Sequence, residues 1–171
     1  MNVRAGVEER TASLRPVGEH DFDRLFRDEH AAVFRVLFAF TGGRRDLAEE
    51  ATAEAFARAI AYRERIRDPL PWIYRTAFRV VQHELGRERR PAAAVAAASD
   101  EPVPGLATLI DALRSLSAQQ RAAIVLRYEA DLPVQEIAAR MGIRSATVRV
   151  HLHRGRNRLR QLLGTEEIDD A

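Results

Sequence analysis

The sequence predicts an all-α protein of two small helical domains joined by a flexible linker. Apolar residues recur three and four positions apart over most of the chain, and no long segment alternates as a β-strand does. Residues 91–105, PAAAVAAASDEPVPG, have prolines at both ends and no amphipathic period, which is the composition of a tether. An alanine-rich helix is the alternative for this stretch. The chain has 171 residues, 46% of them hydrophobic, which is enough for two small cores.

Composition excludes several classes of protein. There is no cysteine, which rules out disulfides, thiol catalysis and cysteine zinc sites. We find no signal peptide and no apolar run near the roughly 20 residues of a spanning helix, so we expect a cytoplasmic protein without membrane insertion. The net charge is only +2, but acids gather at residues 46–54 and 166–170, whereas arginines gather before Pro91 and after Arg140. This separation indicates different partners for different parts of the chain.

The first predicted domain spans residues 21–90 and follows a flexible N-terminal segment, residues 1–20, that has no clear period. Its first helix starts at Asp21, a capping residue type, and stops at the glycine pair 42–43. The second helix starts at Asp46, where Glu49 completes a capping-box pattern. The apolar positions expected to face the core are Phe22, Leu25, Phe26, Val33, Leu37 and Phe40, then Leu47, Ala51, Ala55, Phe56, Ala59 and Ile60.

A third helix completes this domain. An arginine-rich connection over residues 63–71 leads into it. The helix is expected to start near Trp72 and to end about Arg90, because Pro91 cannot continue it. Trp72 is expected to pack in the core.

The second predicted domain spans residues 106–164 and precedes an acidic tail, residues 165–171. Ser117 and Gln120 form a capping-box start for a helix over residues 118–129. Before it, a short helix is marked by Leu109, Ile110, Leu113 and Leu116.

Residues 134–160 have the pattern of two short helices joined at Gly142. Ala138 is a small residue where the helices cross, Gly142 makes the turn, and Val148 is a β-branched residue under the second helix. This is the spacing of a helix-turn-helix, which the second domain is therefore predicted to contain. Ser145 is predicted to cap its second helix.

The second of these helices is predicted to contact DNA, because residues 138–164 contain seven arginines and no acid. A recognition helix places its N-terminal residues against base edges while flanking arginines hold phosphates. The alternative is a solvated basic face on an ordinary helical hairpin. The residues expected to face inward are Val148, Leu152, Leu159 and Leu162, which leaves Arg149, His153, Arg154 and Arg156 at least partly exposed.

No motif in the chain indicates catalysis, a metal or a cofactor. His151 and His153 are two positions apart on a helix and point about 200° apart, so they cannot share one ion. The sequence has no glycine-rich phosphate loop and no nucleophile with a suitable base. We therefore expect a protein that is not an enzyme.

Three segments, in order, give the chain a resemblance to the extracytoplasmic-function (ECF) sigma factors of bacterial RNA polymerase. AEEATAEAFARAI, residues 48–60, resembles the core-binding helix of that family, and PWIYRTAFRVVQHELGRERR, residues 71–90, resembles its promoter-opening helix. Residues 109–163 are similar to the family's second DNA-binding domain over its full length. The resemblance covers residues 22–164 and implies a two-domain helical fold.

The resemblance also implies three sets of site residues. The first would bind polymerase: Glu49, Glu50, Glu54 and Arg58. The second would recognise and open the minus-ten element: Arg65, Ile66 and Arg67 around a flipped base, then Arg75, Arg79, His83 and Arg87 along the helix. The third would bind the minus-thirty-five element: Arg144, Ser145 and Thr147 at the helix start, then Arg149, Val150, His151, His153 and Arg154, with Arg127 as a further phosphate anchor.

Some positions depart from the family's usual residues. Ala53 replaces a common glutamine in the polymerase-binding helix. In the opening helix, Arg79 and His83 stand where asparagine and aspartate are common. In the recognition helix, Val150 and His151 replace a usual serine and arginine. These departures leave the predicted fold intact but make the promoter sequence unpredictable.

The function implied is that of an ECF-type sigma factor that directs promoter recognition and transcription initiation. Its partners would be core RNA polymerase, promoter DNA and an anti-sigma factor, and it would need no cofactor. The alternative is a stand-alone helix-turn-helix regulator that binds operator DNA without core polymerase. A third class is an interaction protein whose first block holds a partner. Residues 48–60 and 71–90 discriminate between these, because a simple operator-binding protein does not need them.

Overall fold

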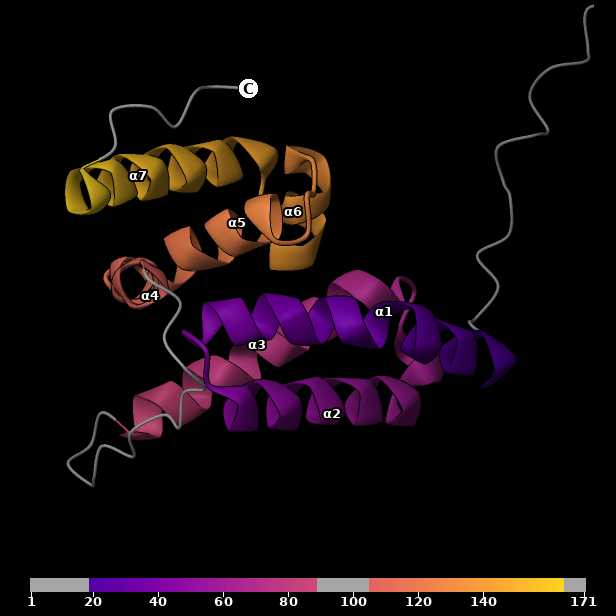
Figure 1. The fold of residues 1–171 in the computed structure, drawn as a ribbon. Coiled ribbons are helices and arrows are strands. Elements are labelled where there is room, and N and C mark those ends of the chain that lie inside the picture. Colours follow the sequence, from indigo (N-terminus) through magenta and orange to yellow (C-terminus); the bar gives the residue numbers. More distant parts are fainter. Residues whose placement is uncertain (1–18, 89–104, 165–171) are drawn as a thin grey trace, which may run out of the picture.

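A computed structural model describes residues 19–88 and 105–164, and within these two ranges the structure is helical with no β-strand (Figure 1). The all-α prediction is thus confirmed. The predictions made for residues 1–18, for most of the linker and for the acidic tail lie outside the described residues. The helices are α1 Glu19–Phe40, α2 Arg45–Ala61, α3 Pro69–Glu88, α4 Leu106–Arg114, α5 Ala118–Tyr128, α6 Val134–Met141 and α7 Ser145–Leu163, with a 3-10 turn η1 at Arg63–Arg65.

Helices α1, α2 and α3 form the first block. α2 packs against both α1 and α3, and it presents alanines to them. Ala48, Ala51 and Ala55 are fully buried, so small side chains let the neighbouring backbones approach closely. Thr52 is buried beside them, and its hydroxyl donates a 2.7 Å hydrogen bond to the Ala48 carbonyl oxygen. This bond satisfies a polar group that would otherwise be costly to bury.

The predicted end of α1 is confirmed and the predicted cap of α2 is wrong. Gly42 and Gly43 both adopt positive φ, at 71° and 86°, and terminate α1. The extended residue before α2 is Arg44, not Asp46, and it makes no side-chain cap. Asp46 instead lies in the first turn, 3.3 Å from the Arg44 guanidinium. Burial would raise the pKa of Asp46, but the Leu47 amide and the Arg44 guanidinium outweigh it and lower this pKa.

The boundaries of α1 and α3 differ from prediction. α1 begins at Glu19, two residues earlier than expected. α3 begins at Pro69, because a proline without N–H is tolerated in the first turn, where that donor has no intrahelical acceptor. Trp72 is only partly buried at the edge of the core, with its ring centroid 6.5 Å from that of Tyr62. Tyr74 and Phe78 are the buried aromatic residues of α3.

Helices α4 to α7 form the second block, in which α7 lies across α5 and α6. The Ser117–Gln120 capping box at the start of α5 is confirmed, with both reciprocal hydrogen bonds at 3.3 Å. Val148, Leu152 and Leu159 are buried as predicted. Three apolar residues expected to face inward are exposed instead, because each lies at the margin of its helix face: Phe26, Ile60 and Leu162.

The two blocks pack against each other, α1 on α5 and α3 on α6 (Figure 1). Arginines make many of the contacts across this boundary. The guanidinium carbon of buried Arg121 lies 4.8 Å from the Phe40 ring centroid, and that of Arg140 lies 5.3 Å from the Tyr74 ring centroid. Arginine suits this position because its planar head stacks on aromatic faces while its stem is buried.

Hydrogen bonds and an ion pair add to the contact between the blocks. Arg114 donates to the Gly42 carbonyl oxygen at 3.2 Å, and Arg35 lies 3.6 Å from Glu129. Burial raises the pKa of the Tyr74 hydroxyl at this boundary, against the opposing charge of Arg140. Among the described helices, none is both long and apolar enough to cross a membrane.

A glycine at the α5–α7 crossing gives a test of this packing. A Cβ built on Gly155 would lie 2.9 Å from Ile124 Cγ1, so the two helices are close only because residue 155 has no side chain. We expect Gly155→Ala to lower the free energy of unfolding by about 1–3 kcal/mol through overpacking, measured by urea denaturation.

Gly86 is the matched control for this substitution. It lies inside α3, and a Cβ built there would meet no atom within 4 Å. Gly86→Ala should raise the free energy of unfolding by about 0.5–1 kcal/mol through helix propensity alone. Equal effects of the two substitutions would contradict the close crossing.

Candidate nucleic-acid interface

The turn between α6 and α7 has the backbone that the sequence predicts. Gly142 adopts φ 68° and ψ 34°, in the left-handed region, and ends α6. The Ile143 N–H donates to the Ala138 carbonyl oxygen at 3.1 Å, which closes the turn. Ala138 and Val148 are buried where the two helices meet. The helix-turn-helix is confirmed.

The predicted cap at the start of α7 is wrong. Arg144, with ψ 147°, is the extended residue before the helix, and Ser145 is already helical. A capping oxygen must come from the extended residue that precedes the helix. Arg144 makes no side-chain cap, so the first N–H groups of α7 have no side-chain acceptor from this residue. Such N–H groups, beside the exposed Thr147, suit a phosphate.

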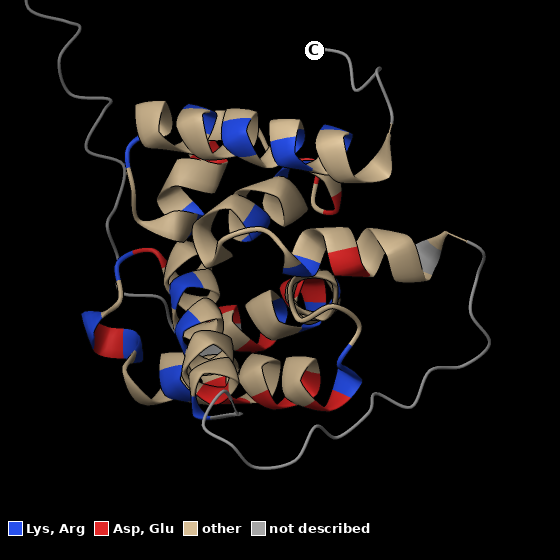
Figure 2. Ribbon diagram, turned by 90° about the vertical axis from the view of Figure 1, so that its left-hand side faces the viewer, with Lys and Arg blue, Asp and Glu red and all other residues tan. Residues whose placement is uncertain are grey.

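The outer face of α7 is basic and exposed. Arg149, Val150, His153 and Arg154 are exposed and His151 is half-buried. Figure 2 shows basic residues along this helix at the top of the molecule. The helix borders an open hollow of about 580 Å³, lined by Arg127, Pro133, Val134, Gln135, Arg149, Leu152, His153 and Arg156.

Two residues of this hollow refine the sequence prediction. Arg127 donates to the Leu132 carbonyl oxygen at 3.3 Å, so one of its donors holds the loop before α6. Gln135, in the first turn of α6, was not predicted as a site residue. Its position depends on the fold of the α5–α6 loop, and no sequence motif marks it.

The residues predicted to contact the minus-ten element differ in their exposure. Arg79, His83 and Arg87 are exposed on α3. Arg75 is half-buried instead and donates to the Ala139 carbonyl oxygen of α6 at 3.2 Å. In this arrangement Arg75 therefore lies in the contact between the blocks.

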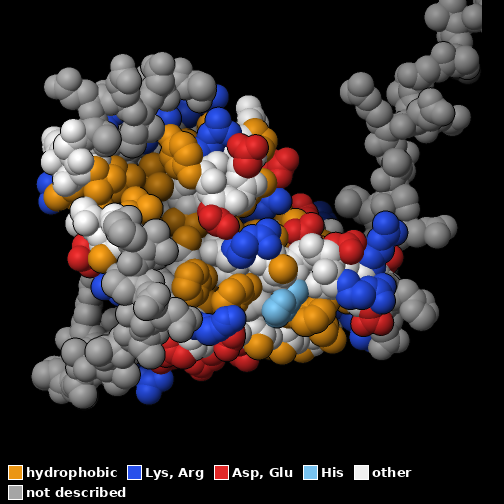
Figure 3. Space-filling model, viewed as in Figure 1, with side chains coloured by type: hydrophobic (Ala, Val, Ile, Leu, Met, Phe, Trp, Pro, Cys, Tyr) orange, Lys and Arg blue, Asp and Glu red, His pale blue; other side chains and the backbone are white. Residues whose placement is uncertain are grey.

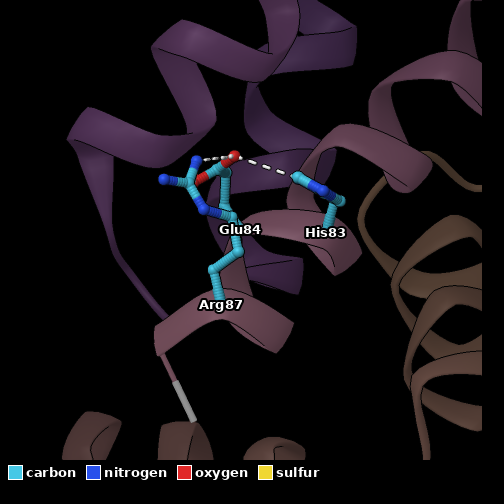
Figure 4. Close-up of polar contacts among 3 residues, drawn as sticks. All are labelled: His83, Glu84 and Arg87. Atoms are coloured by element: carbon cyan, nitrogen blue, oxygen red, sulfur yellow. Dashed lines mark hydrogen bonds and ion pairs between the residues drawn. The ribbon is translucent and has the colours of Figure 1, made fainter. Parts of the chain in front are cut away.

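Figure 4 shows that His83 and Arg87 share the carboxylate of Glu84. His83 Nδ1 and Arg87 Nη1 each lie 3.2 Å from Glu84 Oε1. The hydrogen bond with His83, followed by the charge and hydrogen bonds of Arg87, holds the pKa of Glu84 below its ordinary value. Glu84 thus remains an anion that offsets part of the positive charge on this face.

The loop before α3 places its predicted residues differently. Arg65 and Arg67 are exposed, but Ile66 between them is only 5% exposed and points into the core. Tyr62, which is not among the predicted site residues, is 50% exposed at the same end of α2. A second open hollow of about 530 Å³ is lined by Ile60, Ala61, Tyr62, Arg63, Glu64 and Arg65.

The residues predicted to bind polymerase lie on α2, on the side of the molecule opposite α7 (Figures 1 and 2). Glu49, Glu50 and Arg58 are exposed, and Glu54 is half-buried. Arg58 pairs with Glu54 at 2.6 Å and Arg45 pairs with Glu49 at 3.3 Å. The face thus has mixed charge.

The outward side of α1 carries four aromatic rings at intervals of four residues: Phe26, His30, Phe34 and Phe38. We call this set the aromatic row. Phe26 and Phe38 are exposed, and the centroids of Phe26 and His30 lie 4.6 Å apart. Figure 3 shows hydrophobic and histidine side chains on this face of α1. Exposed aromatic residues are enriched at protein interfaces.

The fold and these surfaces define a class of protein first: a helical DNA-binding protein with a helix-turn-helix and a second helical block. Residues 106–159 match the Sigma-70, region 4 family. RNA polymerase sigma factor CarQ of Myxococcus xanthus is 31% identical over 138 residues, in a match that covers 73% of this chain and 79% of that protein. The chain belongs to the ECF family of RNA polymerase sigma factors.

Two further comparisons agree with this family. RNA polymerase sigma-E factor of Streptomyces antibioticus is 40% identical over 63 residues, a match that covers 37% of this chain and 35% of that protein. The sigma factor RpoE of Bartonella quintana, solved in complex with the anti-sigma factor NepR, has a similar fold with a TM-score of 0.69 at 23% identity. That match covers 86% of this chain and 99% of the solved one.

The Glu84 carboxylate gives a test of the α3 face. Glu84→Gln removes the charge that His83 and Arg87 share, so more positive potential should reach a phosphate backbone. We expect the full chain to bind a labelled single-stranded oligonucleotide about two- to threefold more tightly at low salt, with a steeper salt dependence. Fluorescence anisotropy measures both quantities.

The control is Glu49→Gln, which makes the same charge change on α2. It should leave the binding of the oligonucleotide almost unchanged. If both variants gain affinity equally, the effect is one of net charge, and the local role of Glu84 is refuted.

Proposed function

We propose that this chain directs transcription initiation by binding core RNA polymerase through α2, the upstream promoter element through α7 and the minus-ten region through α3. The observation that carries this proposal is that α2 in the first block has an exposed mixed-charge face and α7 in the second block has an exposed basic face. One chain can then contact an enzyme and DNA at the same time. It acts by binding, without catalysis, in the cytoplasm.

The upstream element would be read from the major groove by α7. Arg149 and Arg154 are exposed and can each make a paired contact with guanine, which discriminates against a wrong base by about 1–3 kcal/mol. Arg144, Ser145, Thr147 and the first N–H groups of α7 would hold a phosphate and set the register. Val150 and His151 stand in place of the usual serine and arginine and would therefore alter the preferred DNA sequence.

Opening of the minus-ten region would use α3 and the loop before it. Arg79, His83 and Arg87 would follow the phosphate backbone, and Arg65 and Arg67 would flank a displaced base. The burial of Ile66 argues for assigning its proposed role to the exposed ring of Tyr62, in the hollow at the end of α2. An aromatic face stacks on any base.

An anti-sigma factor is the third proposed partner. A solved protein of similar fold, the sigma factor RpoE of Bartonella quintana, is in complex with the anti-sigma factor NepR. In this chain the aromatic row on α1 offers an exposed apolar surface beside α2, where an inhibitor could block polymerase. The stand-alone regulator is not favoured, because the similarity to CarQ covers 138 residues and hence extends beyond the helix-turn-helix block.

Run-off transcription with purified core polymerase tests the proposal. The chain should add promoter-specific transcripts from genomic templates. Glu54→Arg should reduce polymerase binding and transcript yield about tenfold or more, because it reverses a charge on the proposed docking face. Asp23→Arg makes the same change on exposed α1 and should retain activity. The absence of any promoter-specific transcript from the unmodified chain would remove the main support for this function.

The two blocks must also separate for this function. Promoter elements about 25 base pairs apart lie about 85 Å apart in B-form DNA. A compact body of about 130 residues has a radius of gyration of about 14 Å, so the packed arrangement cannot reach both elements. The 16 residues between α3 and Gly105 could span at most about 55 Å when extended. This length, added to the size of the two blocks, is enough for the separated blocks to reach both promoter elements.

Energy transfer between two dyes tests this opening. The chain has no cysteine, so Ala57→Cys on α2 and Gln161→Cys on α7 give two unique labelling sites. Transfer should be high in the free chain and fall when core polymerase and promoter DNA are added. A control pair within the first block, Ala31→Cys with Ala57→Cys, should show no change. Unchanged transfer between α2 and α7 in a transcribing complex would contradict opening.

A further inference from the structure

Three side chains on α7 form a chain of hydrogen bonds beside the hollow. They are His153, Asn157 and Arg160, spaced by four and three residues along one side of the helix. Asn157 Nδ2 lies 3.1 Å from His153 Nε2, and Arg160 Nη1 donates to Asn157 Oδ1 at 2.9 Å. His153 is exposed and lines the hollow, whereas Asn157 and Arg160 are half-buried behind it.

Arg160 determines which group donates and which accepts in each of these two hydrogen bonds. A guanidinium stays protonated and offers only donors, so Asn157 must turn its amide oxygen toward it. The amide NH2 then faces His153, and an NH2 group can only donate to an unprotonated ring nitrogen. Nε2 is therefore the acceptor, and the ring proton of a neutral imidazole lies on Nδ1.

We propose that Asn157, oriented by Arg160, is a positioning residue that holds His153 as the neutral tautomer with its proton on Nδ1. His153 then presents a single hydrogen-bond donor to the DNA. The inference rests on the proposed function, in which His153 faces the upstream element. The reversed amide would place its NH2 against the Arg160 guanidinium, with donors on both sides and no acceptor between them.

This tautomer restricts the bases to which His153 can donate a hydrogen bond. In the major groove, purine N7, guanine O6 and thymine O4 are acceptors, whereas cytosine presents only the N4 amino donor. His153 should therefore disfavour cytosine at the position it contacts. The contact is neutral, so it discriminates between bases without adding to the salt dependence that arginine–phosphate contacts cause. Asn157 thus adds a specificity determinant that touches no DNA.

The tautomer is directly measurable in the full chain. Long-range ¹H–¹⁵N correlation spectra of ¹⁵N-histidine protein, recorded above pH 8, distinguish a protonated from an unprotonated ring nitrogen. We expect unprotonated Nε2 and protonated Nδ1 for His153 in the unmodified chain. Asn157→Leu removes the donor at similar volume, and the ring should then populate the Nε2–H tautomer. An Nε2–H tautomer in the unmodified chain would overturn the proposal.

Selection of bound promoters from a randomised library tests the consequence for DNA. His153→Ala first identifies the base pair that depends on His153. At that position Asn157→Leu should weaken the discrimination against cytosine by about fivefold, with the salt dependence unchanged. In the His153→Ala background, Asn157→Leu should have no further effect at that position. A persistent effect there, or unaltered base preference in the single variant, would show that Asn157 does not act through His153.

Failure of this inference differs from failure of the proposed function. If the chain selects no sequence even with core polymerase, the promoter-directing function fails and the specificity role of Asn157 falls with it. The spectra still decide whether Asn157 fixes the tautomer. If the chain selects promoters and transcribes but Asn157→Leu changes neither the tautomer nor the base preference, only the inference about Asn157 is lost.

Discussion

The left-handed backbone at Gly142 is the constraint on which the DNA-binding half depends. It ends α6 and sets the angle at which α7 leaves, so that Val148 is buried while Arg149 faces outward. The same residue lies against the other block, because a Cβ at position 142 would come 2.9 Å from Arg75 Cδ. An L-residue here would meet both strain at φ 68° and a steric contact. One glycine thus fixes the recognition helix and permits the block contact.

Arginine serves two purposes in this chain, which has no lysine among its 27 basic residues. On the outer face of α7 it supplies charge. Between the blocks, Arg121 and Arg140 use their planar heads on the rings of Phe40 and Tyr74. A lysine ammonium is more strongly hydrated and cannot stack, so it would lose more on burial at these positions. The boundary between the blocks can therefore be polar in composition and still be well packed.

The sequence predicted what local rules determine. The glycine turns at residues 42–43 and 142 and the Ser117 capping box were confirmed, because each depends on a few adjacent residues. The caps assigned to Asp46 and Ser145 were wrong, because an arginine immediately before each helix takes the extended backbone. Burial of Ile66, engagement of Arg75 by Ala139 and the hydrogen bond between Asn157 and His153 depend on side-chain direction and packing. Periodicity does not report them.

The contact of Arg75 with α6 makes two uses of one side chain mutually exclusive. While its guanidinium donates to the Ala139 carbonyl oxygen, it cannot also neutralise a phosphate of melted DNA on α3. Were Arg75 to bind the opened strand, as the resemblance implies, closure of the two blocks and capture of that strand would compete for the same donor, and each would lower the apparent affinity of the other. Under the proposed function, the free protein would discriminate against stray single strands through thermodynamic linkage, with no inhibitor required.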